Sequence, residues 1–293
     1  MEFVTESPEH HFLTTLEKLR QDAAGWAGMH FSLSTQLDYN DVISEPGYIK
    51  GKLFEVKKSA ESLARKIQEK GISSPEAILY QFSDCDIILL IRPESETARQ
   101  TLQTLYKEIS AQAGEKISTY SNLVKGIYDY QKIADQRLLG AKRIEAYEDM
   151  ADANRVASIP LRRQRRDDAL VMVVEDDRFT ASYASNILNK QYEMVLARSG
   201  EEAISCYIEH APDIVFLDIH LPGLSGNDTL LGIRAIDPDA FIVMLSVDTS
   251  KTNIVTASKG GAAGFLKKPF SKERMLHIVQ SSSFVKNREQ NRR

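Results

Sequence analysis

DIVFLDIHLPGLSG, residues 213–226, contains a run of four apolar residues that ends on a carboxylate. The run, Ile214 to Leu217, is typical of a strand buried in a parallel sheet. Asp218 follows it directly, and a charge at the edge of a core is costly unless another group pairs with it. The stretch therefore predicts a buried strand whose last side chain has a partner elsewhere in the fold.

The residues around this stretch alternate between strand and helix patterns from residue 169 to 285. We expect strands at 169–174, 192–197, 214–217, 241–246 and 263–266, and helices at 179–189, 200–210, 227–235, 250–259 and 272–285. Strands that alternate with helices predict a parallel sheet covered on both faces, a doubly wound α/β fold. In such sheets the functional residues follow the carboxyl ends of the strands.

Polar side chains follow four of these predicted strands. Glu175 and Asp176 end the first strand, Asp218 the third and Ser246 the fourth, and the fifth runs into Lys268. Clustered carboxylates cannot all stay ionised without a cation, and an oxygen-rich set suits Mg²⁺. A carboxylate surrounded by a divalent metal, an ammonium and a hydroxyl is equipped to accept a phosphoryl group.

The motifs VMVVEDD, IVFLDIHLPGLSG, IVMLS and GFLKKPF, in this order, resemble the receiver domain of two-component response regulators, which has a flavodoxin-like (βα)5 fold. The resemblance places this domain at residues 169–293. It implies that Asp218 is the phospho-acceptor, and that a histidine kinase or histidine phosphotransfer protein is the phosphoryl donor. The site residues that it implies are Glu175, Asp176, Asp218 and the backbone carbonyl of His220 for Mg²⁺, and Ser246, Lys268 and Phe265 for phosphate binding and switching.

Neighbouring residues have simpler interpretations. Asp177 is expected to be exposed near a helix start, and Lys267 to face solvent. Phe265 is either a switch residue, as the resemblance implies, or an ordinary core residue. The resemblance also implies a cis bond before Pro269, and a kinase contact made by exposed side chains of the first helix. Those side chains are taken to be Phe179, Tyr183 and Ile187.

Residues 1–118 are expected to form a separate α+β domain. Its predicted order is strand 26–33, helix 53–70, strands 77–82 and 86–91, and helix 94–113. This order resembles the palm-like core of nucleotide-cyclising GGDEF domains. The hairpin turn lacks the glycines of an active domain, so the resemblance implies a degenerate, non-catalytic one. Asp84 and Asp86 are interpreted as turn-capping residues, with metal binding as the alternative.

Residues 119–168 are expected to connect the two domains. Apolar residues recur at intervals of three and four from Leu123 to Ile144, which predicts a long helix. The helix either packs against its own domain or forms a coiled-coil seam. The run from Pro160 to Asp168 contains four arginines and is interpreted as a solvated linker, with a nucleic-acid or anionic-lipid patch as the alternative.

Composition limits the remaining functions. The formal net charge of −4 gives no overall attraction to nucleic acid, and two distant cysteines fit a reducing, cytoplasmic location. The first residues are acidic and polar, so no signal peptide is expected, and no apolar run is long enough for membrane insertion. Enzymatic activity is not expected beyond phosphoryl acceptance and autodephosphorylation by the receiver.

Three hypotheses for the whole chain follow. The favoured one is a signalling protein in which phosphorylation at Asp218 switches the interaction of residues 1–156 with an unidentified partner protein or with a second copy of the chain. The first alternative is a divergent nucleotidyl cyclase. The second is a nucleic-acid-binding regulator that uses the arginines 162, 163, 165 and 166 and the basic C-terminal tail.

Overall fold

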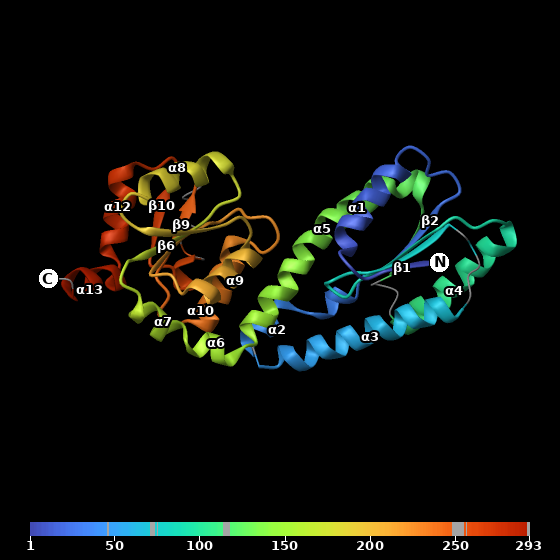
Figure 1. Cartoon of the computed structure of the whole chain (residues 1–293), viewed down its shortest axis with the longest axis horizontal. Helices are drawn as coiled ribbons and strands as arrows, with labels where there is room; N and C mark the ends of the chain where they lie inside the picture. Colours follow the sequence, from blue (N-terminus) through green and yellow to red (C-terminus); the bar gives the residue numbers. More distant parts are fainter. Residues whose placement is uncertain are drawn as a thin grey trace. The chain divides into compact units, whose positions relative to one another are not determined.

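The computed structural model describes residues 1–45, 47–70, 74, 76–113, 118–247, 255 and 257–291. The chain forms two compact units (Figure 1). The first comprises Met1–Val42 and Tyr48–Ile144, and the second comprises Ile43–Gly47 and Glu145–Arg293. The division falls at residue 144, inside the predicted connector of residues 119–168: residues 119–144 belong to the first unit and residues 145–168 to the second.

The first unit contains a five-stranded sheet in the order β1-β3-β4-β2-β5. Its strands are β1 (Glu2–Val4), β2 (Ala27–Phe31), β3 (Ala77–Gln81), β4 (Ile87–Ile91) and β5 (Ser118–Asn122). β1 pairs with β3 in parallel, and the other neighbours are antiparallel. The predicted strands and helices from residue 26 to 113 are confirmed, and with β5 they complete a β-α-β-β-α-β arrangement.

Helices cover both faces of this sheet. α3 (Ile49–Glu69) contacts β3 and β4, and α4 (Glu96–Ala113) contacts β5. On the other face, α1 (Pro8–Leu19) and α5 (Leu123–Met150) share a hydrophobic cluster with β3 and β4. The short segments η1 (Leu33–Gln36) and α2 (Tyr39–Ser44) join β2 to α3.

Helix α5 packs on its own sheet, which decides between the two interpretations of the long helix. Leu123, Tyr130 and Ala134 lie in the core cluster of the first unit. The ring of Tyr130 lies so close to Gly28 on β2 that a Cβ there would be 2.4 Å from its hydroxyl oxygen. The apolar period of α5 is therefore that of a core-packed helix.

The second unit contains a parallel sheet in the order β10-β9-β8-β6-β7. Its strands are β6 (Leu170–Val174), β7 (Glu193–Ala197), β8 (Ile214–Asp218), β9 (Ile242–Ser246) and β10 (Gly264–Lys267). All five strands were predicted, and their order is the flavodoxin-like one, 2-1-3-4-5 in chain order. Every residue of β6, β8 and β9 is buried, which explains their continuous apolar sequences.

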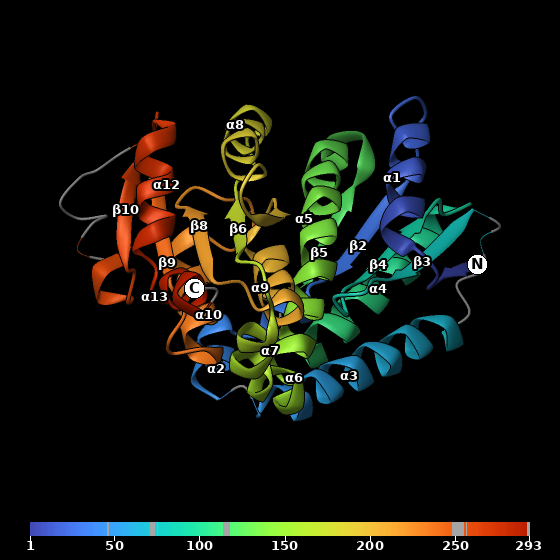
Figure 2. The same cartoon turned by 60° about the vertical axis from the view of Figure 1, so that its left-hand side comes forward.

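The helices of the second unit lie on both faces of its sheet (Figure 2). α8 (Arg178–Leu188) and α12 (Lys272–Ser281) contact each other and share one core cluster with the strands. α9 (Gly200–His210) and α10 (Gly226–Ile236) also pack together, against β7 and β8. Of the helix predicted at 250–259, only residue 255 and residues 257–259 are described, and these are helical.

The predicted basic linker is a folded part of the second unit. It contains α6 (Ala153–Ala157) and α7 (Ile159–Arg165), and the terminal helix α13 (Ser283–Asn291) lies beyond α12. Arg163 is 3% exposed and forms an ion pair with Asp237. Arg288 of α13 pairs with Asp213 and also donates to the carbonyl oxygen of Arg163. The linker interpretation was wrong because the carboxylates that pair with these arginines are far away in sequence.

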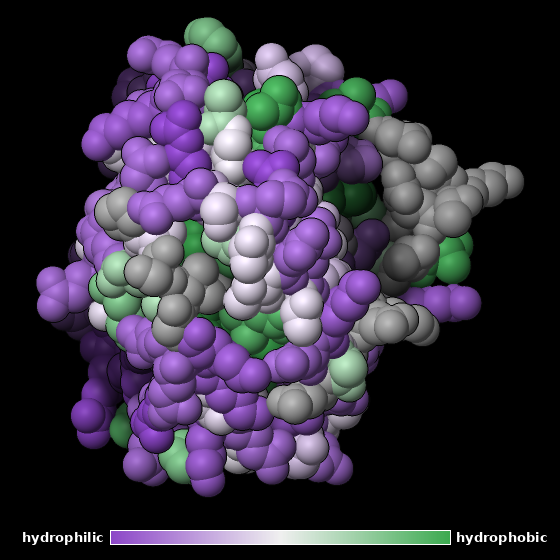
Figure 3. Space-filling model, turned by 90° about the vertical axis from the view of Figure 1, so that its right-hand side faces the viewer, coloured by the Kyte–Doolittle hydropathy of each residue, from purple (hydrophilic) through white to green (hydrophobic). Residues whose placement is uncertain are grey.

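The face of the first unit in Figure 3 is mostly hydrophilic, with small separate hydrophobic areas. In the part of the chain that the structure describes, no helix has the length and apolar character that a membrane span requires.

Candidate functional site

The carboxyl ends of four parallel strands bring the predicted site residues together. Glu175 follows β6, Asp218 ends β8 and Ser246 ends β9, while Lys268 follows β10. The register aligns them: Asp218 lies opposite Leu245, and Ser246 opposite Lys267. The backbone N–H of Lys268 also donates to the carbonyl oxygen of Ser246, at 2.8 Å. Parallel pairing therefore builds the site from residues almost a hundred positions apart.

Lys268 is the cationic partner that the buried end of β8 requires. Its Nζ lies 3.0 Å from Oδ2 of Asp218 and 2.5 Å from Oε2 of Glu175. Both carboxylates are almost inaccessible, with Glu175 1% and Asp218 5% exposed. Burial raises the pKa of Glu175 and the charge of Asp218 raises it further, while Lys268 acts in the opposite direction. The ammonium thus compensates two carboxylates that would otherwise repel each other.

Asp176 completes a group of three carboxylates. Glu175, Asp176 and Asp218 each offer one oxygen, and these oxygens lie within 4.8 Å of one another. Asp176 is exposed while the other two are buried, so the group opens to solvent on one side. Hard carboxylate oxygens beside open solvent suit Mg²⁺, which binds through one or two carboxylates and keeps several waters. The donor set therefore fits a magnesium ion.

The other predicted site residues lie in different environments. Ser246 is buried, Phe265 is half-buried opposite Met244 on β9, and His220 is exposed in the loop after β8. The peptide bond between Lys268 and Pro269 is cis, as the resemblance implied.

The simpler interpretations of Asp177 and Lys267 agree with the structure. Asp177 is the exposed N-cap of α8, and its Oδ1 accepts a 2.8 Å hydrogen bond from the backbone N–H of Thr180. That bond lowers the pKa of Asp177. Lys267 is exposed, whereas Lys268 is half-buried and pairs with the carboxylates of the site.

The proposed kinase-contact residues on α8 do not share one exposed face. Phe179 is 87% exposed and Tyr183 48%, but Ile187 is 5% exposed and belongs to the core cluster. The prediction for Ile187 was wrong: eight residues of helix, at 3.6 per turn, rotate it by about 80° relative to Phe179.

The first unit holds a buried charged cluster at its hairpin turn. The guanidinium of Arg137 on α5 pairs with Asp84, at 2.7 Å, and with Asp86. Nε2 of His30 lies 2.8 Å from Asp86, and the backbone N–H of Ser34 donates to the same carboxylate. Both carboxylates are at most 2% exposed. They are therefore ion-paired inside the protein, and the turn-capping interpretation describes only the 3.2 Å bond from Asp86 N–H to Asp84.

The pKa values of the two acids in this cluster shift in opposite directions. Burial, and then the charge of Asp86, raise the pKa of Asp84 to about 7. Burial also raises the pKa of Asp86, but the His30 hydrogen bond and the charge of Arg137 outweigh it, so the net shift is downward. The cluster thus holds one carboxyl group whose pKa is lowered and one whose pKa is raised to about 7.

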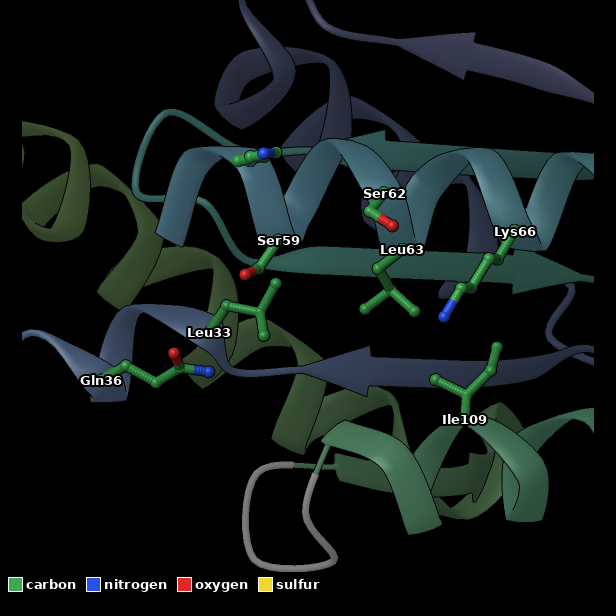
Figure 4. Close-up of a pocket in the computed structure, with 8 residues that line it drawn as sticks. Leu33, Gln36, Ser59, Ser62, Leu63, Lys66 and Ile109 are labelled. Carbon is green, nitrogen blue, oxygen red and sulfur yellow. The ribbon is translucent and has the colours of Figure 1, made fainter. Parts of the chain in front are cut away.

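A hollow between η1, α3 and α4 in the first unit has a volume of about 430 Å³. Figure 4 shows its lining, which comes from η1, α3 and α4. The lining residues are Leu33, Gln36, Lys58, Ser59, Ser62, Leu63, Lys66 and Ile109. They include no carboxylate, histidine or cysteine, so they offer neither a metal ligand set nor an acid–base pair.

The arginines 162, 163 and 166 hold the second unit together. Arg162 donates to the carbonyl oxygens of Ile208 and Glu209, and Arg166 to that of His210, all at the end of α9. Arg163, as described above, pairs with a buried carboxylate. Of the four arginines in the predicted nucleic-acid patch, only Arg165 is exposed; Arg162 and Arg166 are half-buried and Arg163 is buried. The nucleic-acid alternative therefore gains no support from these side chains.

Arg137 and Glu201 are among the buried charged residues that sequence reasoning missed. Arg137 lies in the middle of an amphipathic helix, and Glu201 lies at the start of α9, where it is 0% exposed. For Arg137 the signal was present: it continues the buried period of Leu123, Tyr130 and Ala134. For Glu201 there was none, because two consecutive glutamates at a helix start usually indicate a favourable interaction with the helix dipole.

The second unit is similar in sequence to known proteins. Residues 171–280 match the response regulator receiver domain family. Chemotaxis protein CheY of Listeria monocytogenes is 36% identical over 115 residues, which are 39% of this chain and 97% of that protein. Chemotaxis protein CheY of Thermotoga maritima is 35% identical over 115 residues, 39% of this chain and 96% of that protein. The crystal structure of Vibrio cholerae CheY4 is 27% identical, with a TM-score of 0.38, and covers 39% of this chain and 98% of that one.

The comparisons do not support the GGDEF likeness of the first unit, and Arg137 occupies the carboxylates of the hairpin where such a domain would bind metal. For residues 171–280, sequence identity and strand order lead to the same result. The chain belongs to the response regulators of two-component systems, and these residues are its receiver domain.

Proposed function

We propose that this response regulator accepts a phosphoryl group on Asp218 and thereby switches an interaction of its first unit. One observation carries the proposal: the carboxylate of Asp218 lies at a strand end with Lys268 at 3.0 Å, beside two further acids within 4.8 Å. That arrangement combines a nucleophile with the positive charges that phosphoryl transfer needs.

The reaction is phosphoryl transfer from a phosphohistidine of a histidine kinase or phosphotransfer protein. An oxygen of Asp218 forms a bond to phosphorus while the P–N bond breaks, and the imidazole keeps the electron pair. Lys268 neutralises phosphoryl oxygens as they approach, and the hydroxyl of Ser246 donates a hydrogen bond to one of them. Phe265 then turns inward behind Ser246. Hydrolysis of the mixed anhydride by water returns the carboxylate and inorganic phosphate.

Mg²⁺ is the cofactor of this proposal. Glu175, Asp176 and Asp218, together with the backbone carbonyl of His220, would hold it. When bound, the ion would supply positive charge against the phosphoryl oxygens. The exposed position of Asp176 supports this assignment, because a ligand open to solvent allows the ion to enter and to keep waters.

The output is proposed to be a protein interaction in the cytoplasm, with an unidentified partner or a second copy of the chain. Two features of the first unit argue against a catalytic role: Asp84 and Asp86 are ion-paired inside the protein, and the hollow lined by η1, α3 and α4 contains no carboxylate, histidine or cysteine. The mostly hydrophilic face in Figure 3 fits an interaction formed on signal.

The experiment is phosphorylation by a small acyl phosphate with Mg²⁺, followed by intact mass. The wild type should gain one phosphoryl group, and Asp218→Asn should gain none. Asp177→Asn, which changes an exposed neighbouring carboxylate, is the matched control and should behave as wild type. Equal phosphorylation of Asp218→Asn would overturn the proposal. Light scattering with beryllofluoride then separates the outputs: a change in mass indicates self-association, and an unchanged mass indicates a different partner.

A further inference from the structure

The loop after β8 forms a hydrogen bond with a buried carboxylate of a neighbouring helix. Glu201, in the first turn of α9, is 0% exposed, and its Oε1 accepts a 3.1 Å hydrogen bond from the backbone N–H of Leu224. The loop carries His220 and the exposed Gly223, and it ends where α10 begins at Gly226. Glu201 thus fastens the loop to a different helix.

The contact between Glu201 and the loop is tight on both sides. Gly223 has a φ of +78°, and a Cβ there would lie 2.4 Å from both carboxylate oxygens of Glu201. At Gly200, a Cβ would lie 2.5 Å from the carbonyl oxygen of Leu224. Two glycines therefore allow backbone and carboxylate to approach closely, and a larger residue at either position requires the loop to move.

The same loop returns to the phospho-acceptor. A Cβ at Gly226 would lie only 2.0 Å from the carbonyl oxygen of Asp218, and the N–H of Gly226 donates to the carbonyl oxygen of Ile219 at 2.9 Å. The segment between these anchors contains His220, whose carbonyl oxygen is the proposed metal ligand. A displacement of Leu224 therefore also displaces the carbonyl oxygen of His220, which lies a few residues earlier in the same loop.

We propose that Glu201 is a positioning residue for the magnesium site: by holding Leu224, it fixes the loop that presents the carbonyl oxygen of His220. The inference rests on the proposed function, since it concerns the same metal. Burying a carboxylate is unfavourable unless its hydrogen bonds repay the loss of water, and here the bond formed is to the loop backbone. Glu201 itself does not touch the phosphoryl group.

The test is Mg²⁺ binding to the full-length protein by isothermal titration calorimetry. Glu201→Ala should bind Mg²⁺ about tenfold more weakly, in the range seen when residues supporting a metal ligand are removed. Glu201→Gln should stay close to wild type, because its amide oxygen still accepts from Leu224. Glu202→Ala is the matched control on the same turn. Glu202 accepts from the N–H of Arg198 instead, and its removal should leave the affinity unchanged.

A second variant approaches the contact from the loop. Gly223→Ala places a methyl group against the carboxylate of Glu201 and should also weaken Mg²⁺ binding, so the test survives if Glu201→Ala does not fold. Wild-type affinity in both Glu201→Ala and Gly223→Ala would refute the positioning role. Equal weakening by Glu201→Gln and Glu201→Ala would refute it too, because the charge and not the bond would then matter. If the wild type itself binds no Mg²⁺, the proposed function fails instead.

Discussion

Arg137→Met should strongly destabilise the first unit and spare the second. The substitution removes the cation from a site where Asp84 and Asp86 are at most 2% exposed, while their other hydrogen bonds stay in place. Breaking a buried ion pair by removing one partner typically costs about 3–5 kcal/mol. Here one guanidinium serves two carboxylates, so we expect the upper part of that range at pH 8 and above.

The loss should depend on pH through Asp84. Its folded pKa of about 7 lies above the ordinary value of 3.8, so its contribution to stability is full at low pH and is lost as pH rises through about 7. Arg137 lowers that pKa, and its removal therefore raises it further. Because protonation relieves the unpaired charge, the variant should lose less free energy of unfolding at about pH 6 than at about pH 8.

Urea denaturation followed by tryptophan fluorescence measures this loss. Trp26 is the single tryptophan of the chain and lies in the core cluster of the first unit, so it reports on that unit alone. Lys132→Met is the control, since it removes a cation from an exposed position of α5 and should change stability by less than about 0.5 kcal/mol. Equal stability of the two variants, or a larger loss at low pH, would refute the reasoning.

Three further predictions concern the second unit. Arg163→Ala should lower its free energy of unfolding by about 3–5 kcal/mol, measured by calorimetry. Arg165→Ala, at an exposed position, should change that free energy by less than about 0.5 kcal/mol. Similar losses in the two variants would contradict the assigned ion pair. Ile187→Ala should cost about 2–5 kcal/mol and Phe179→Ala little, by urea denaturation, and the reverse order would show that the two burial assignments are wrong. Lys268→Met leaves two buried carboxylates unpaired, so its melting temperature should fall without Mg²⁺ and rise more than that of wild type when Mg²⁺ is added. An unchanged melting temperature without the metal would contradict this.

The receiver domain was predictable because its strands are buried on both faces. Such strands have uninterrupted apolar sequences, so a carboxylate such as Asp218 at a strand end is conspicuous. Parallel topology places the carboxyl ends of the strands at one edge of the sheet. This rule predicts that Glu175 and Lys268 lie near Asp218.

The remaining features depend on contacts that a sequence pattern does not contain. β5, Ser118–Asn122, reads STYSN and has no apolar run, and its identity as a strand comes from pairing with β2. Arg163 in α7 and Arg166 directly after it looked solvated because their partners, Asp237 and Asp213, lie some fifty to seventy residues further along the chain. In both cases tertiary contacts outweighed local composition.

The contact between α7 and α13 determines how this receiver can be joined to other chains. Arg288 donates to the carbonyl oxygens of Arg163 and Arg166, so the segment entering the domain and the segment leaving it lie side by side. A domain whose entry and exit meet can be inserted into a surface loop of a host protein with little distortion, and its original ends can be joined by a short linker. Circular permutants with new ends in an exposed loop should therefore fold, provided that α7 and α13 are both retained.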